Sequence, residues 1–154
     1  MTVILSFDPA SNKATTSNSG VVLIDNGKLL NHWCLPYGVE GIRKWYYEEF
    51  DGIECDKVIF EYFEARDNSK SKDNTVLETI AEIKRLIPYA EPFRNGGYQT
   101  DVPNELLKAL GLWKFGKSHH QDVRAAARLA LFYAMRNDIE DFVTGVGGLL
   151  GERI

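Results

Sequence analysis

Four side chains, in three separate parts of the chain, have the types and spacing needed for divalent-metal chemistry. Asp8 and Glu61 each follow a run of apolar residues, and His119 and Asp122 stand three residues apart before an alanine-rich segment. A spacing of three places two side chains on one face of a helix. If the fold brings all four together, they would bind divalent cations. Two such cations about 3.5–4 Å apart can activate a water and stabilise the leaving oxygen of a phosphodiester.

Each of these residues also has a purely structural interpretation. Asp8 precedes Pro9, and Asp-Pro commonly opens a turn that the carboxylate caps. Asp122 is favourable near a helix N-terminus, where His119 would be a solvated first-turn residue. However, an unpaired carboxylate at the end of a buried strand is costly, so Asp8 requires a cation or a donor network. The joint pattern of two strand acids and one helix-start pair favours a metal site.

The hydrophobic pattern predicts the elements that must position these side chains. Strands are expected at 1–7, 20–24, 28–34, 57–63 and 89–93, and helices at 39–50, 74–87, 103–111, from 118 onward and at 139–143. The sequence Asp25-Asn26-Gly27 predicts a tight hairpin turn. Continuous apolar strands are typical of the middle of an α/β sheet covered on both faces.

This order of elements predicts a ribonuclease H-like fold. We expect an α/β architecture with a mixed five-stranded sheet, its first three strands antiparallel, flanked by helices. The first and fourth strands are then neighbours about 4.8 Å apart, which places Asp8 beside Glu61. Two carboxylates that close repel each other unless one is protonated or a cation lies between them.

Length and composition predict one domain over residues 1–154, with 137–154 the least defined part. No apolar run approaches the ~20 residues of a membrane span, and the N-terminus lacks the layout of a signal peptide. Cys34 and Cys55 fit no metal-ligand spacing, which favours a reduced, cytoplasmic setting.

The distribution of charge leaves room for a localised basic face. The net charge of −4 argues against a protein that coats nucleic acid by bulk attraction. Residues 61–136 nevertheless carry 12 basic and 10 acidic groups, whereas the segments on both sides carry an acidic excess. Any acids of the middle block that bind metal would increase its basic surplus.

Three blocks of the sequence resemble the RuvC-type Holliday-junction resolvases of the ribonuclease H-like superfamily. Residues 4–11, followed by Gly-Val-Val at 20–22, resemble their opening motif, and residues 58–61 resemble their second acidic strand. Residues 119–126 resemble the start of their final helix. The blocks occur in the family's order through about residue 136, and the short length is similar to that of the phage-encoded members.

The resemblance implies a homodimeric, magnesium-dependent endonuclease that nicks opposing strands of four-way DNA junctions. Asp8, Glu61, His119 and Asp122 would be its catalytic and metal-binding residues, with two Mg²⁺ ions expected. His119 replaces an acid of the commoner pattern, and an imidazole suits a softer ion, so Mn²⁺ should serve at least as well as Mg²⁺. The sequence departs from the family at Ala10, where glycine is common, and in its longer loop after Pro9.

Contacts to branched DNA are predicted on both sides of the acidic residues. The resemblance implies an aromatic wedge near Phe63, although Phe63 and Tyr62 also suit a hydrophobic core. Basic residues that would suit phosphate backbones are Arg66, Lys70, Lys72, Lys114 and Lys117. A solvated surface is the alternative role of these five side chains.

Two other functions remain open. The first is a nuclease of the same fold that cuts forks, flaps or RNA in RNA/DNA hybrids. The second is a DNA-structure binding module that does not cleave. A phosphate-binding domain related to actin-like ATPases is disfavoured, because the chain is short and lacks a second glycine-rich phosphate loop. Location in the cytoplasm, of the host if the protein is phage-encoded, is expected.

Overall fold

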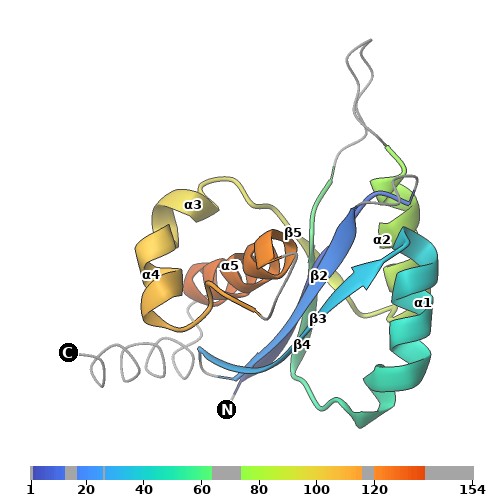
Figure 1. Ribbon diagram of the computed structural model, residues 1–154, viewed down its shortest axis with the longest axis horizontal. Coiled ribbons are helices and arrows are strands. Elements are labelled where there is room, and N and C mark those ends of the chain that lie inside the picture. The colour runs from blue at the N-terminus through green and yellow to red at the C-terminus, as the bar shows by residue number, and fades with distance from the viewer. Residues whose placement is uncertain (1, 13–16, 26, 64–73, 116–119, 138–154) are drawn as a thin grey trace.

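A five-stranded sheet with the strand order β3-β2-β1-β4-β5 forms the centre of the molecule (Figure 1). The computed structural model describes residues 2–12, 17–25, 27–63, 74–115 and 120–137. The strands are β1 (Val3–Asp8), β2 (Asn18–Asp25), β3 (Lys28–Pro36), β4 (Lys57–Glu61) and β5 (Glu91–Phe93). The helices are α1 (Gly38–Glu49), α2 (Val76–Leu86), α3 (Tyr98–Asp101), α4 (Asn104–Ala109) and α5 (His120–Arg136), with a 3-10 turn, η1, at Phe50–Gly52.

The sheet has the mixed topology that the sequence predicts. β1, β2 and β3 are antiparallel neighbours, whereas β4 runs parallel to β1 and β5 runs parallel to β4. Gly27, with φ 84°, lies in the turn between β2 and β3. The predicted α/β fold, with helices on both faces of a five-stranded mixed sheet, is therefore confirmed.

The alternation of side chains along β1 divides the core into two layers. Leu5 and Phe7 pack with the hydrophobic cluster that contains Ile42 and Trp45 of α1. Ile4 packs on the opposite face, in the cluster that includes the buried side chains of α5. Figure 1 shows α1 and α2 on one side of the sheet and α3, α4 and α5 on the other. Because alternate residues of a strand share a face, Asp8 lies on the same face as Ile4, beneath α5.

The buried faces of α5 and α2 differ in chemistry. The alanine-rich segment of α5 supplies a buried small-residue face at Val123, Ala126, Ala127, Ala130, Leu131 and Ala134. In α2, Leu77 is 36% exposed, while Glu82 is buried. Glu82 pairs with Arg43 of α1 at 2.7 Å and with Arg85 at 2.5 Å, so a buried carboxylate joins the two helices.

Other differences lie between and beyond the main elements. The sequence predicts no helix between the strand at 89–93 and the helix at 103–111, but α3 begins at Tyr98. The predicted helix at 139–143 and the predicted start of the last helix at residue 118 lie outside the described residues. Within the described part of the chain, no helix is long and apolar enough to cross a membrane.

Candidate active site

A row of aligned residues crosses the sheet beneath the start of α5. Strand pairing places Cys34 opposite Gly20, and Gly20 opposite Asp8. β1 and β4 are parallel and in register at Phe7 and Phe60, so Glu61 comes next to Asp8. Since Asp8 and Glu61 end their strands on the same face, the predicted meeting of the two carboxyl groups occurs.

Asp8 and Glu61 share a side-chain hydrogen bond. The pKa of Asp8 lies well above its usual value, first because burial disfavours the charged form, and then because of the hydrogen bond and the negative charge of Glu61. The charge of Asp122 raises this pKa further. Asp8 therefore lies close enough to both other acidic residues for their charges to act on it.

The first turn of α5 packs directly against Gly20. A Cβ atom at this glycine would lie 2.1 Å from the carbonyl oxygen of Asp122 and 2.6 Å from the backbone nitrogen of Val123. No other residue type has room there, because the obstruction is backbone rather than a movable side chain. The absence of a side chain at Gly20 is therefore what allows Asp122 to approach Asp8. The sequence motif contains this glycine, but the reason for it comes from α5, about 100 residues later.

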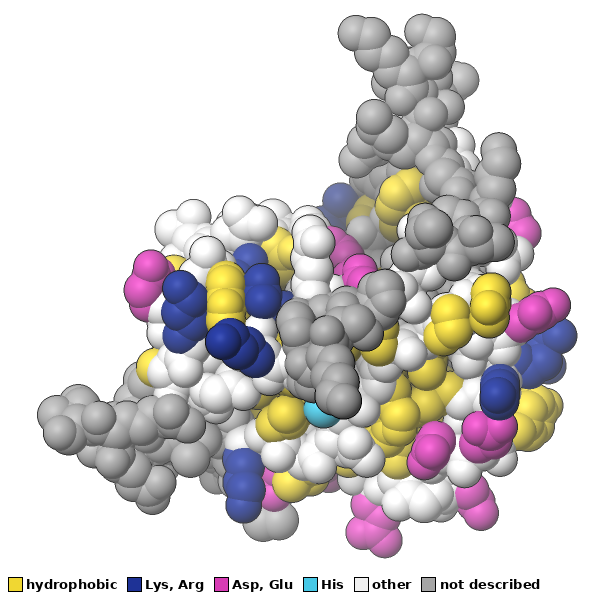
Figure 2. Space-filling view, in the orientation of Figure 1, with side chains coloured by type: hydrophobic (Ala, Val, Ile, Leu, Met, Phe, Trp, Pro, Cys, Tyr) yellow, Lys and Arg dark blue, Asp and Glu magenta, His cyan; other side chains and the backbone are white. Residues whose placement is uncertain are grey.

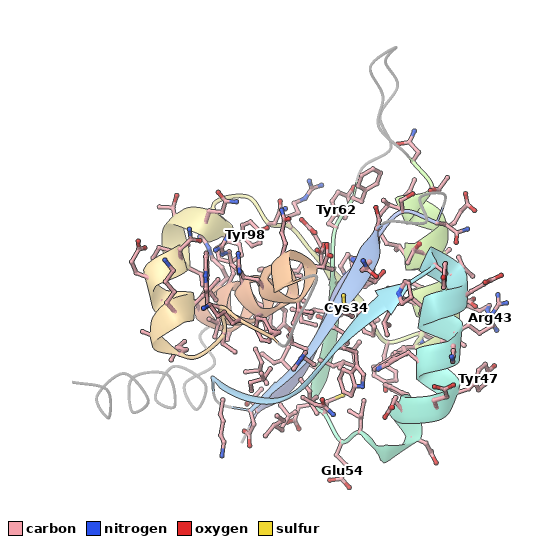
Figure 3. The ribbon with its side chains drawn as sticks, viewed as in Figure 1. Cys34, Arg43, Tyr47, Glu54, Tyr62 and Tyr98 are labelled. Atoms are coloured by element: carbon pink, nitrogen blue, oxygen red, sulfur yellow. The ribbon has the colours of Figure 1, made fainter. Side chains whose placement is uncertain are left out.

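Two residues after β5 extend the site: Asn95 in the loop and Tyr98 at the start of α3. Asn95 donates a hydrogen bond through Nδ2 to Oε1 of Glu61, and its side chain also bonds with Tyr98. Burial raises the pKa of Tyr98, and so do the charges of Glu61 and Asp8. Figure 3 shows Tyr98 and Tyr62 at the end of the sheet where β4 ends. Sequence reasoning missed Asn95 and Tyr98, since nothing in their local pattern distinguishes them from ordinary loop residues.

Beside Glu61, the chain presents an aromatic and a basic side chain. Tyr62 is 37% exposed and Phe63 is half-buried. The guanidinium carbon of Arg94, which follows β5, lies 4.1 Å from the centre of the Tyr62 ring. Tyr62 is thus the more accessible of the two aromatics left open by the sequence. Arg94, which no motif indicated, stands next to it.

The donor set fits hard divalent cations, although it is not assembled as a complete ligand shell. Among the residues that the structure describes, no group of three His, Cys, Asp or Glu side chains is arranged to hold a metal ion. Asp8 and Glu61 nevertheless form an oxygen-rich pair whose mutual repulsion a cation would relieve. Asp122 acts on Asp8 of that pair through its charge. The fourth predicted ligand, His119, lies outside the described residues.

The predicted DNA contacts are described only in part. Lys114 is exposed, and Phe63 lies two residues beyond Glu61. The other predicted contacts, Arg66, Lys70, Lys72 and Lys117, lie outside the described residues. Their role in DNA binding therefore stays a prediction.

The pKa of the Cys34 thiol depends in part on the charge of Asp122. Burial and then the nearby Asp122 raise the pKa of the Cys34 thiol from 9.0 to about 11. At pH 8 its thiolate fraction is about 100-fold below that of an unperturbed thiol, so we expect alkylation by iodoacetamide about 100-fold slower than in the unfolded chain. Peptide-resolved mass spectrometry of timed samples would measure this, and Asp122→Asn should accelerate it. Equal rates in the folded and unfolded chains would contradict the burial of Cys34, and an unchanged rate in Asp122→Asn would contradict its placement beside Asp122.

Comparison with known proteins relates this fold to solved structures that include Thermus thermophilus RuvC. Thermus thermophilus RuvC in complex with a Holliday junction substrate superimposes with a TM-score of 0.64 and 13% sequence identity, covering 92% of this chain and 98% of that one. A second structure of Thermus thermophilus RuvC gives a TM-score of 0.64 and 11% identity, covering 89% and 96%. No protein-family model and no curated protein sequence matches the chain. The chain therefore has the RuvC-like form of the ribonuclease H-like fold that its motifs predicted.

Proposed function

We propose that this protein is a metal-dependent, structure-selective DNA endonuclease that resolves four-way junctions by hydrolysing phosphodiesters. The observation that carries the proposal is the Asp8–Glu61 carboxyl pair, which shares a hydrogen bond under the first turn of α5. The charge of Asp122 also raises the pKa of Asp8. The RuvC-like fold supports a nuclease, and the junction-bound state of Thermus thermophilus RuvC supports branched DNA as the substrate.

The proposed chemistry assigns a role to each acidic residue. Asp8, Glu61, Asp122 and His119 would hold Mg²⁺, with two ions expected. Bound there, the ions would activate a water and neutralise charge on the leaving oxygen. Asn95 would fix the orientation of the Glu61 carboxylate through its Nδ2 donor. Tyr98, packed beside the pair, would help to exclude bulk water from it.

The same proposal includes the assembly and the DNA contacts. We infer a homodimer of a single domain spanning residues 1–154, because symmetric nicking of a four-way junction requires two sites. A cytoplasmic location, of the host if the protein is phage-encoded, would give access to such DNA. The proposed DNA contacts are Phe63, Arg66, Lys70, Lys72, Lys114 and Lys117. Tyr62 and Arg94 join them because they stand beside Glu61.

A cleavage assay on a panel of end-labelled DNA substrates tests the proposal. The panel contains a four-way junction, a fork, a flap, a linear duplex and an RNA/DNA hybrid, each incubated with Mg²⁺, Mn²⁺ or EDTA. We expect paired, symmetric nicks in the four-way junction that depend on the metal. Equal cleavage of all branched substrates would favour the broader nuclease, and cleavage of the hybrid alone would exclude resolution.

A second candidate function is that of a DNA-structure binding module that does not cleave DNA. It is favoured by one observation, that no three potential ligands among the described residues are arranged to hold a metal. This function predicts that Asp8→Asn does not change junction binding. It also predicts no cleavage with either metal. The same assay, with binding measured in parallel, therefore separates the two functions.

The choice of metal tests the role of His119. If its imidazole is an inner-sphere ligand, Mn²⁺ should support cleavage at least as fast as Mg²⁺, because nitrogen ligands favour the softer ion. Single-turnover rates over a concentration series of each metal would measure the preference. His119→Asp provides the control, since it should shift the preference towards Mg²⁺. Activity with Mn²⁺ far below that with Mg²⁺ would argue against His119 as a ligand.

A further inference from the structure

A basic surface patch surrounds Trp113 on the side of the molecule formed by α4 and the start of α5. We define this Trp113 patch by four residues: Lys108, Trp113, Lys114 and Arg124. The guanidinium carbon of Arg124 lies 3.5 Å from the centre of the Trp113 ring, and Nζ of Lys108 lies 4.7 Å from it. In Figure 2, Lys and Arg side chains gather around a hydrophobic one in this region.

The guanidinium of Arg124 is held in place over the Trp113 ring. Nε and Nη2 of Arg124 donate to the carbonyl oxygen of Trp113 at 3.1 and 2.9 Å, which fixes the guanidinium over the ring. Among the residues that the structure describes, none of Lys108, Lys114 and Arg124 forms an ion pair with a carboxylate. The nearby Arg128, one turn along α5, adds further positive charge; burial first, and then the charge of Arg128, lowers the pKa of Arg124. Three cations without a carboxylate partner in the described part of the chain suit an anionic ligand.

The shape of the patch suits an extended ligand rather than a small one. Lys108, Gly111, Trp113 and Lys114 line a shallow depression of about 480 Å³. Both lysines are exposed, so their ammonium groups can move to meet successive charges. A polymer with regularly spaced phosphates can engage separated cations in this way, through contacts that are independent of sequence.

The position of the patch relates it to the acidic site. Asp122 and Arg124 are two residues apart on α5, about 200° around the helix, so their side chains leave opposite sides of the same turn. One helix diameter is about 10–12 Å, which corresponds to roughly three to four base pairs of duplex at about 3.4 Å each. A duplex arm that lies across the start of α5, with one phosphate at the acidic pair, would therefore have its next few phosphates within reach of the patch.

We propose that the Trp113 patch binds the phosphate backbone of a duplex DNA arm, a few base pairs away from the phosphodiester held at Asp8 and Glu61. This inference rests on the proposed function, because it assumes that DNA is the substrate. Trp113 acts as the platform that fixes Arg124, while the exposed lysines adjust to the phosphates. The patch supplies affinity and orientation and does not read sequence.

The test compares two double variants of equal charge. Lys108→Ala/Lys114→Ala removes the two exposed lysines of the patch, whereas Lys28→Ala/Lys57→Ala removes two exposed lysines from the strands β3 and β4, outside the patch. Fluorescence anisotropy with a labelled four-way junction in EDTA gives the dissociation constant at several salt concentrations. Thermal melting verifies that each variant is folded.

We expect Lys108→Ala/Lys114→Ala to weaken junction binding at least about 10-fold at 100 mM salt and to reduce the slope of log K against log salt by about two. Lys28→Ala/Lys57→Ala should bind like the parent protein. If both double variants bind like the parent, or both weaken equally, the patch proposal is overturned. Junction cleavage by the parent protein would still support the proposed function in that case. A parent protein that binds no DNA would overturn both proposals.

Discussion

Replacing Asp8 with Asn is expected to reduce the rate of metal-dependent junction cleavage by a factor on the order of 10³, while the protein still folds and binds DNA. Asn retains the size of Asp but lacks the negative oxygen that a divalent cation requires beside Glu61. Removing one group that stabilises transition-state charge typically costs 10²–10³-fold or more in rate, and each tenfold loss corresponds to about 1.4 kcal/mol. Single-turnover cleavage with excess protein would measure the effect without interference from product release.

The matched control for this variant is Asp51→Asn, which makes the same chemical change at an exposed position in η1. It should leave cleavage unchanged. Junction binding in EDTA should be retained or strengthened in Asp8→Asn, because a negative charge near the DNA is lost. Cleavage by Asp8→Asn within tenfold of the parent rate would remove Asp8 from the catalytic site.

The same substitution should change how the metal-free protein responds to pH. The pKa of Asp8 is raised in the folded state, so its contribution to stability is present below the unfolded pKa and is lost as pH rises through the folded pKa. In EDTA, Asp8→Asn should therefore gain stability relative to the parent as pH rises from 4 to 8. Urea unfolding at each pH would measure the difference. A stability difference that stays constant over this range would contradict a raised pKa for Asp8.

Added Mg²⁺ should reverse this order of stability at neutral pH. A cation that binds the folded state stabilises it by mass action, and the parent protein should bind the cation more tightly than Asp8→Asn. We therefore expect the midpoint of unfolding of the parent to rise with Mg²⁺ concentration, and that of Asp8→Asn to rise much less. An equal response of both proteins would place the cation elsewhere.

Replacing Gly20 with Ala is expected to have the second large effect, and to damage both stability and activity. The new Cβ would lie 2.1 Å from the carbonyl oxygen of Asp122, so the start of α5 must move. Overpacking commonly costs about 1–3 kcal/mol, and here the obstruction is backbone, which places the cost at the upper end of that range. A shift of about 1 Å in Asp122 would lower the cleavage rate by about 10²-fold.

Gly52→Ala is the control, because nothing lies within 4 Å of a Cβ atom at that position. Urea unfolding would give the loss of stability, and single-turnover cleavage at a temperature where both variants are folded would give the loss of activity. We expect Gly52→Ala to resemble the parent in both measurements. If Gly20→Ala folds and cleaves normally, Asp122 does not depend on the contact between α5 and β2.

The sequence by itself determined the sheet and the location of the acidic residues along it. Continuous apolar runs ending in Asp8 and containing Glu61 predicted two central strands, and the turn at residues 25–27 predicted the antiparallel pairing of β2 with β3. These features depend on local periodicity and turn chemistry, which a single sequence carries directly. The alanine-rich face of α5 was predicted for the same reason.

Only the tertiary structure decided which side chains surround the carboxyl pair. Asn95 reaches Glu61 from 34 positions away, and Arg124 reaches the carbonyl of Trp113 from another element. The close approach that requires glycine at position 20 comes from the backbone of Asp122. Such contacts depend on distances between elements that are remote in the chain, and their residues have no distinctive local pattern. Local periodicity fixes the face on which a side chain lies, whereas its neighbour there is fixed by how the layers pack.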